Sequence, residues 1–152
     1  MIADITGAAG AGSTSHAHWL ETLARADDAA MKAIAEDLLP GLGEIEVVQS
    51  RTGLVMLPMR DTVAGTDFHL GEVLVAEAHI RLPGTTFEGY GMVTGRDLER
   101  AMAMAVIDAA AVAGKDTARI AQFIATQAQQ ARQTDTDRLR AVEATRVDME
   151  TF

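Results

Sequence analysis

The sequence contains no cysteine and few aromatic residues, and each shortage limits what the protein can be. Without cysteine the chain can form no disulfide framework, no thiol nucleophile and no thiolate-bound metal or iron–sulfur cluster. Aromatic residues account for 4% of the chain although 48% of it is hydrophobic, so aliphatic side chains and methionine must build the core. The lack of cysteine also fits the cytoplasm, where we expect the protein to reside.

Positive charge is scarce as well. Thirteen lysines and arginines stand against 22 acidic residues, which gives a formal net charge of −9. Nucleic-acid backbones and anionic membranes bind basic surfaces, so neither is an expected partner. The N-terminus lacks the basic and apolar regions of a signal peptide. The alanine-rich segment 101–113 is too short to cross a bilayer.

The chain has the length of one domain, and its N-terminal part predicts two helices. Residues 1–12 are small and rich in glycine and alanine, so we expect a flexible tail there and a single domain over residues 13–152. A serine or threonine at positions 13–15 can cap a first helix that ends near residue 26. A second helix is expected over residues 28–39, with Pro40 and Gly41 as its end.

The hydrophobic pattern then changes from the helical period to alternation. Residues 44–50, 53–60, 68–82 and 87–93 read as four strands, with a turn at 51–53 between the first two. Consecutive strands with short connections form an antiparallel meander. Two more helices are expected over 95–113 and 116–132, and the second can restart after residue 135. The sequence therefore predicts an α+β domain: a four-stranded antiparallel sheet with two N-terminal and two C-terminal helices.

The segment GYGMVTG (residues 89–95) lies between a strand and a helix, where glycine-rich loops can bind phosphate. Its GxGxxxG spacing differs from the dinucleotide-binding motif, and the chain has no GK[ST] sequence. Close packing explains the same residues, because glycines in a strand allow a helix to approach. Thr94 and Asp97 would then form a capping box at the start of the helix.

Arg96 is not explained by packing, because a cation opposes the dipole at a helix N-terminus. It requires a nearby carboxylate or an anionic ligand. The candidates for binding such a ligand are Arg60, Arg96 and Gly95. Arginine suits this role because its guanidinium binds phosphate and carboxylate groups in a bidentate manner.

Three carboxylates are interpreted as structural. Glu72 falls on the apolar register of its strand, so it must turn outward at a bulge or pair with Arg60. Asp97 belongs to the helix cap. Asp108 lies at the edge of the apolar helix, where it can pair with Arg96 or Arg60.

No metal site or catalytic set is recognised in the sequence. His69 and His79 share the polar face of a strand, but ten residues of extended chain separate them by roughly 33 Å. They cannot bind one metal ion unless the strand breaks. The serines lack the sequence context of a nucleophile elbow. The catalytic residues are therefore left unassigned.

The helix expected over 95–113 is apolar on nearly all sides, and such a helix is buried on all sides. A small domain with one sheet has little to cover its second face, so we expect another protein chain to do so. Met102 and Ile107 are then predicted to lie at that interface. Arg146 and Asp148, near the C-terminus, have the pattern of a docking segment.

Five segments carry a family pattern in a fixed order and spacing: TGLV (52–55), MRDTVAGTDFHLGEVLV (59–75), GYGMVTGRD (89–97), AVIDAA (105–110) and TRVDM (145–149). Together they closely resemble PhnG, the G subunit of the bacterial carbon–phosphorus lyase core complex of phosphonate breakdown. The resemblance extends from Trp19 nearly to the end of the chain. No one segment is diagnostic alone.

The resemblance implies a subunit that works chiefly with the I subunit, and also with the H and J subunits. Together with the H and I subunits and an associated ATP-binding-cassette-like L protein, such a subunit is expected to displace adenine from MgATP with an alkylphosphonate and to form a ribose 1-phosphonate 5-triphosphate. The J subunit is expected to cleave the C–P bond in a later step. MgATP would thus be a substrate of the complex, and no cofactor is expected on this chain alone. The nucleosidase chemistry is expected on the I subunit, and the resemblance assigns no catalytic residue to this chain.

Two functions therefore remain open. The first is a supporting subunit of the phosphonate–nucleotide transferase, which is not catalytic alone. The alternative is a self-sufficient small enzyme or binding domain for a phosphorylated ligand, which would use Arg60, Arg96 and the segment 89–95. The incomplete catalytic set and the apolar helix favour the subunit.

Overall fold

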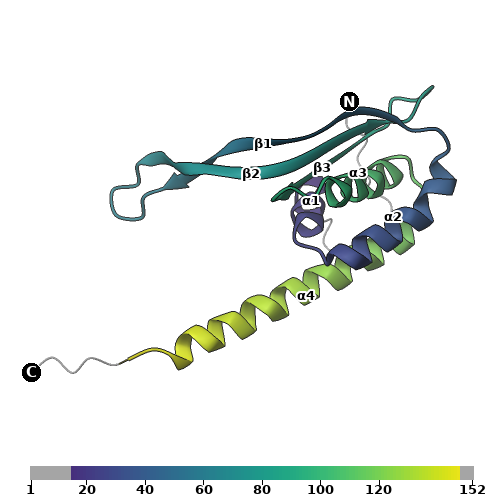
Figure 1. The fold of residues 1–152 in the computed structure, drawn as a ribbon. Helices are drawn as coiled ribbons and strands as arrows, with labels where there is room; N and C mark the ends of the chain where they lie inside the picture. Colours follow the sequence, from purple (N-terminus) through teal and green to yellow (C-terminus); the bar gives the residue numbers. More distant parts are fainter. Residues whose placement is uncertain (1–14, 148–152) are drawn as a thin grey trace, which may run out of the picture.

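The computed structural model describes residues 15–147, which form an α+β domain as expected. Its three strands form an antiparallel sheet in the order β1-β2-β3, and the helices lie on one side of this sheet (Figure 1). The elements are α1 (His16–Ala24), α2 (Asp28–Leu42), β1 (Glu46–Arg60), β2 (Asp67–Arg81), β3 (Glu88–Thr94), α3 (Leu98–Val112) and α4 (Thr117–Ala144). The predicted tail over residues 1–12 lies outside the described residues.

The prediction of four strands is wrong, because the segments 44–50 and 53–60 belong to one strand. β1 passes through the expected turn without a break: Arg51 pairs with Glu77 and Gly53 pairs with Val75 on β2. The partner strand supplies hydrogen bonds along the whole of β1, and this non-local pairing overrides the local turn tendency of glycine. In the described residues one long strand, β1, therefore replaces the two short strands and the turn that the sequence predicts over residues 44–60.

The predicted ends of the helices are partly wrong. Ser15 caps α1 as expected, since its side chain accepts the His18 N–H. Pro40 does not end α2, which continues to Leu42 and stops at Gly43 with a φ of 74°. Glycine adopts this left-handed conformation without strain, so it ends the helix.

The start of α3 also differs from the prediction. Asp97 is itself the N-cap and accepts the Arg100 N–H at 2.9 Å, so the capping box with Thr94 does not form. α4 continues through the break expected near residue 132 as one uninterrupted helix. Gly114 follows α3 with a φ of 70°, a left-handed conformation in which glycine commonly ends a helix.

The core is built around α3, and the chain itself covers this helix. α3 contacts β2 and β3 on one side and α2, α1 and α4 on others. Ile107 has 0% exposure, and Met102 packs partly buried against the same core. The expectation that a partner covers Ile107 is therefore wrong. Alanine-rich helices are thin, so one sheet and the neighbouring helices are enough to enclose this one.

Candidate functional site

Two glycines of the segment 89–95 bring β3 against α3. A Cβ atom at Gly89 would lie 2.1 Å from the Ala105 carbonyl oxygen, and one at Gly91 would lie 1.9 Å from the Ala101 carbonyl oxygen. Real Cβ atoms do not approach backbone atoms so closely, so only glycine fits at both positions. The close-packing interpretation of this segment is confirmed. The α3 backbone fills the space that a phosphate cradle would need on this side of β3.

The opposite face of the sheet carries a connected group of polar side chains from β2 and β3. His79 stacks on Tyr90 with ring centroids 4.3 Å apart and an angle of 19° between the ring planes. Glu88 accepts hydrogen bonds from the Tyr90 hydroxyl at 2.7 Å and from Arg81 Nε at 3.1 Å. His79 Nε2 lies 3.0 Å from the same carboxylate. We call His79, Arg81, Glu88 and Tyr90 the β2–β3 network.

The network stabilises the charged form of its carboxylate. Hydrogen bonds from Tyr90, Arg81 and His79 lower the pKa of Glu88 from 4.5 to about 2. Tyr90 shows the reciprocal effect, because its hydrogen bond to Glu88 and its burial raise the pKa of the phenol. Glu88 is therefore ionised at neutral pH and serves as an acceptor for hydrogen bonds, and it is not a proton donor there.

This shift predicts an acid-dependent stability. The folded state holds the pKa of Glu88 at about 2, below the ordinary 4.5, so the unfolded chain takes up the proton first as the pH falls. The contribution of Glu88 is complete above pH 4.5 and is lost as the pH falls toward 2. Urea unfolding between pH 2 and 6 should show a shallower loss of stability for Glu88→Gln than for the wild type. The exposed Glu36→Gln is the control and should keep the wild-type slope, and an unchanged slope for Glu88→Gln would contradict this role.

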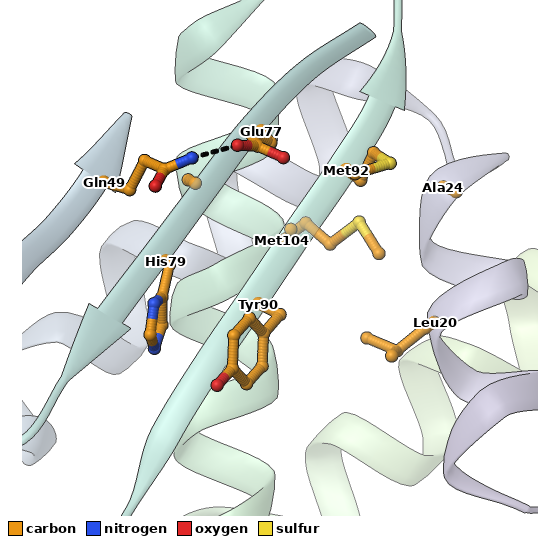
Figure 2. Close-up of a pocket in the computed structure, with 10 residues that line it drawn as sticks. Leu20, Ala24, Gln49, Glu77, His79, Tyr90, Met92 and Met104 are labelled. Atoms are coloured by element: carbon orange, nitrogen blue, oxygen red, sulfur yellow. Dashed lines mark hydrogen bonds between the residues drawn. The ribbon is translucent and has the colours of Figure 1, made fainter. Parts of the chain in front are cut away.

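The network borders a shallow hollow of about 440 Å³. Figure 2 shows His79, Tyr90 and Met92 on the strands, while Leu20 and Ala24 of α1 lie beyond β3. Gln49 donates a hydrogen bond to Glu77 at one end of the hollow. The lining that the described residues provide is mostly apolar and includes no arginine or lysine to face a phosphate. Its chemistry suits an apolar or aromatic group better than a highly charged one.

A second polar group joins three elements at the edge of β3. Asp108 on α3 is 3% exposed and accepts the backbone N–H of Tyr90 at 2.9 Å. Its other oxygen lies 2.6 Å from Nε2 of His16 at the start of α1. The structural role of Asp108 is therefore supported, but its side-chain partner is His16 and not Arg96 or Arg60. This pair fastens α1 to α3.

The candidate ligand-binding residues do not form one site. Arg60 lies at the end of the hairpin, where its Nη1 is 3.5 Å from the carboxylate of Asp67. Gly95 and Arg96 lie beside the middle of β2, where β3 ends, since the Gly95 N–H bonds the Leu74 carbonyl oxygen. Leu74 lies seven positions after Asp67, which corresponds to roughly 23 Å of extended chain. Arg96 is exposed and has no ion pair or hydrogen bond within residues 15–147.

The other predicted polar residues have simple surroundings. Glu72 pairs with Met56 across the hairpin and is exposed, so it does not need Arg60. A register shift at Leu57 and Pro58 marks the irregularity expected beside it. The Arg100 N–H and Lys32 lower the pKa of Asp97, and the Lys32 Nζ lies 3.0 Å from its carboxylate.

The predicted C-terminal docking segment is described only in part. Arg146 donates a hydrogen bond to Glu143 Oε1 at 3.2 Å, within one turn of the chain. Asp148 lies outside the described residues. The role of this segment in docking stays a prediction.

Residues 15–147 contain neither a recognisable metal-binding cluster nor a helix that could span a membrane. They contain no group of three or more histidine or acidic side chains placed to hold a metal ion. None of their helices combines the length and the hydropathy that crossing a membrane requires.

The sequence contained a signal for one of the two polar groups. The tight turn at residues 82–87 fixes the register of β2 and β3, so that Arg81 faces Glu88 and His79 faces Tyr90. Alternation along these two strands could therefore have placed the four side chains together. No local sequence pattern predicts the pairing of His16 with Asp108, because 92 positions separate the two residues.

Comparison with known proteins assigns the chain to a protein family. The model of the family described as phosphonate metabolism protein PhnG matches residues 14–152. A curated relative, the putative C-P lyase subunit protein HtxH of Stutzerimonas stutzeri, is 31% identical over 102 residues. The aligned region covers 60% of this chain and 27% of HtxH, so the chain spans about a quarter of that relative's length. The match places the chain among proteins of phosphonate metabolism. More particularly, the chain belongs to the PhnG family.

Proposed function

We propose that this chain is a subunit of a carbon–phosphorus lyase complex in organic phosphonate catabolism. In this role it supports the transfer of the ribose triphosphate of MgATP to an alkylphosphonate, with release of adenine. Membership of the PhnG family and the similarity to a putative C-P lyase subunit support the proposal. The expected partners are the I subunit first, and the H and J subunits next.

The observation that carries this choice is the packing of Gly89 and Gly91. A self-sufficient enzyme for a phosphorylated ligand would use the segment 89–95 as a phosphate cradle, but the backbone of α3 already fills the space beside both glycines. Transfer chemistry on a triphosphate needs cations and donors that converge on it. Arg60 lies at the far end of the β1–β2 hairpin and Arg96 lies beside the middle of β2, so the two do not converge. The described residues therefore favour a supporting role within a complex.

One observation supports part of the alternative hypothesis, in which this chain binds a phosphorylated ligand. The guanidinium of Arg96 is exposed and has no partner within residues 15–147. It can contact an anion of the substrate or a carboxylate of a partner once the complex has assembled. Arg96 would then contribute to a site that other subunits complete.

Reconstitution tests the proposal. The purified chain alone should not release adenine from MgATP and methylphosphonate, and the H, I and J subunits with the associated L protein should lose activity when this chain is omitted. Arg96→Ala should assemble normally yet lower turnover roughly tenfold, the usual size for a lost charged contact. Turnover by the chain alone, or full activity without it, would overturn the subunit role. Failure of the Arg96 variant to assemble would mean that this arginine is structural.

A further inference from the structure

The β1–β2 hairpin extends well beyond the rest of the sheet. β3 pairs with β2 only from Val75 to Arg81, so residues 54–74 form a two-stranded ribbon that projects from the body of the molecule (Figure 1). We call residues 54–74 the arm. A two-stranded ribbon without a covering layer is marginally stable in water. Packing within this chain therefore does not explain why the arm is so long.

Both faces of the arm carry exposed apolar side chains. The pairs Leu54–Leu74 and Met56–Glu72 share one face, while Val55–Val73 and Leu57–Gly71 share the other, because strand residues alternate between faces. Nine large side chains of the arm are exposed hydrophobic residues: Leu54, Val55, Met56, Leu57, Met59, Val63, Phe68, Leu70 and Leu74. Soluble monomers rarely expose so much apolar surface in one place. A partner must enclose the arm from two sides to cover it.

The outer edge of the arm is also open. β1 is the terminal strand of the sheet, so within residues 15–147 the backbone groups on its outer side have no strand to pair with. Edge strands are usually protected by lysines or prolines. β1 has no lysine over its fifteen residues, and Pro58 is its only proline. An edge of this length and composition can accept a further strand.

Charge indicates which kind of protein supplies that strand. The whole chain carries a formal net charge of −9, so two copies repel each other. Glu72 stands exposed among the apolar side chains of the arm and has no partner within residues 15–147. A cation opposite Glu72 would complete this surface.

We propose that the arm docks into another subunit, which adds an extended strand to the free edge of β1 and covers both apolar faces. That subunit places a lysine or arginine opposite Glu72. The inference rests on the proposed function only in the choice of partner, because the I subunit is the partner used to test it. It replaces the interface that the sequence predicted at Ile107 with one on the opposite end of the domain's long strands.

A matched pair of variants tests the arm. Leu54 is 62% exposed on the arm, and Leu139 is 69% exposed on α4, so an aspartate at either position leaves the core intact. Binding to the I subunit should become about 30-fold weaker for Leu54→Asp, the loss expected for one central interface residue, and should stay unchanged for Leu139→Asp. Titration calorimetry gives the affinities, and circular dichroism checks the fold of each variant. Equal binding by the two variants, whether kept or lost, would overturn the docking role of the arm.

Two further measurements address the strand and the charge. Hydrogen exchange should show that amides of residues 46–60 become protected when the I subunit binds, and no change there would overturn strand addition. Glu72→Lys should weaken binding about tenfold or more through repulsion of the facing cation, and unchanged affinity would overturn that part of the proposal.

A shortened arm gives a control for folding and separates the two proposals. Residues 55–73 are replaced by Asn-Gly, a favoured two-residue hairpin turn, so that Leu54 and Leu74 still pair. This chain should fold and should not bind. Binding without the arm would overturn the docking inference and leave the subunit role in place, whereas full activity of the other subunits without this chain would overturn the subunit role itself. If the wild-type chain forms a dimer that Leu54→Asp abolishes, the occupant is a second copy, and the inference of a different partner is wrong.

Discussion

Gly91→Ala should destabilise the protein by about 3 kcal/mol or more, at the upper end of the range for overpacked sites. The added Cβ would lie 1.9 Å from the Ala101 carbonyl oxygen and 2.9 Å from the Ala105 backbone nitrogen. Both obstacles are backbone atoms of α3, so no side chain can rotate aside. The helix must move away from β3, and the contacts of α3 with the sheet must loosen along its length. Thermal unfolding should show a midpoint lower by roughly 10 °C.

Gly53→Ala is the matched control, because Gly53 also lies in a strand. A Cβ at this position meets nothing within 4 Å, and its φ is not positive. Alanine restricts the unfolded chain more than glycine does, so this variant should be unchanged or more stable by up to about 1 kcal/mol. If Gly91→Ala melts at the same temperature as Gly53→Ala, the contact between β3 and α3 is looser than described, and room for a ligand beside the glycines would have to be reconsidered.

Local patterns predicted those elements whose ends depend on nearby residues. β2 and β3 lie close to the predicted strands 68–82 and 87–93, and a tight turn between Leu82 and Phe87 joins them. β1 could not be predicted in one piece, because its continuity through Gly53 depends on pairing with β2, which lies more than twenty residues further along the chain. Hydrogen bonds to a distant strand leave no trace in the local sequence.

The candidate site shows the same division. The spacing of the glycines argued against a known phosphate motif, and the distances to Ala101 and Ala105 explain why glycine is required. Nothing in the sequence connected His16 with Asp108, because only the fold brings α1 beside α3. The apolar pattern of α3 was interpreted correctly as burial on all sides. What covers the helix could not be inferred, since periodicity shows which sides avoid water and not which element shields them.

Ile107→Asp should prevent the isolated chain from folding. Ile107 is 0% exposed and belongs to the hydrophobic core, so the variant loses an apolar side chain and buries a carboxylate in its place. The combined cost exceeds about 5 kcal/mol, which equals or exceeds the stability of many domains. Expression should yield aggregated or unfolded protein, with no cooperative transition in circular dichroism. This result would replace the sequence-based expectation that position 107 lies on a partner interface.

The neighbouring residue explains why a charge at position 107 is costly. Asp108 is also buried, at 3% exposure, but one of its oxygens accepts the Tyr90 N–H and the other lies against His16. A carboxylate at position 107 would face the apolar core without such donors, and an unpaired buried charge is strongly destabilising. Val112→Asp, at an exposed position of the same helix, should fold normally, and Ile107→Val should cost about 1 kcal/mol. If Ile107→Asp is as soluble as Val112→Asp and unfolds as cooperatively, the side of α3 that carries Ile107 is not buried in the core. The partner interface predicted from the sequence at position 107 would then be restored.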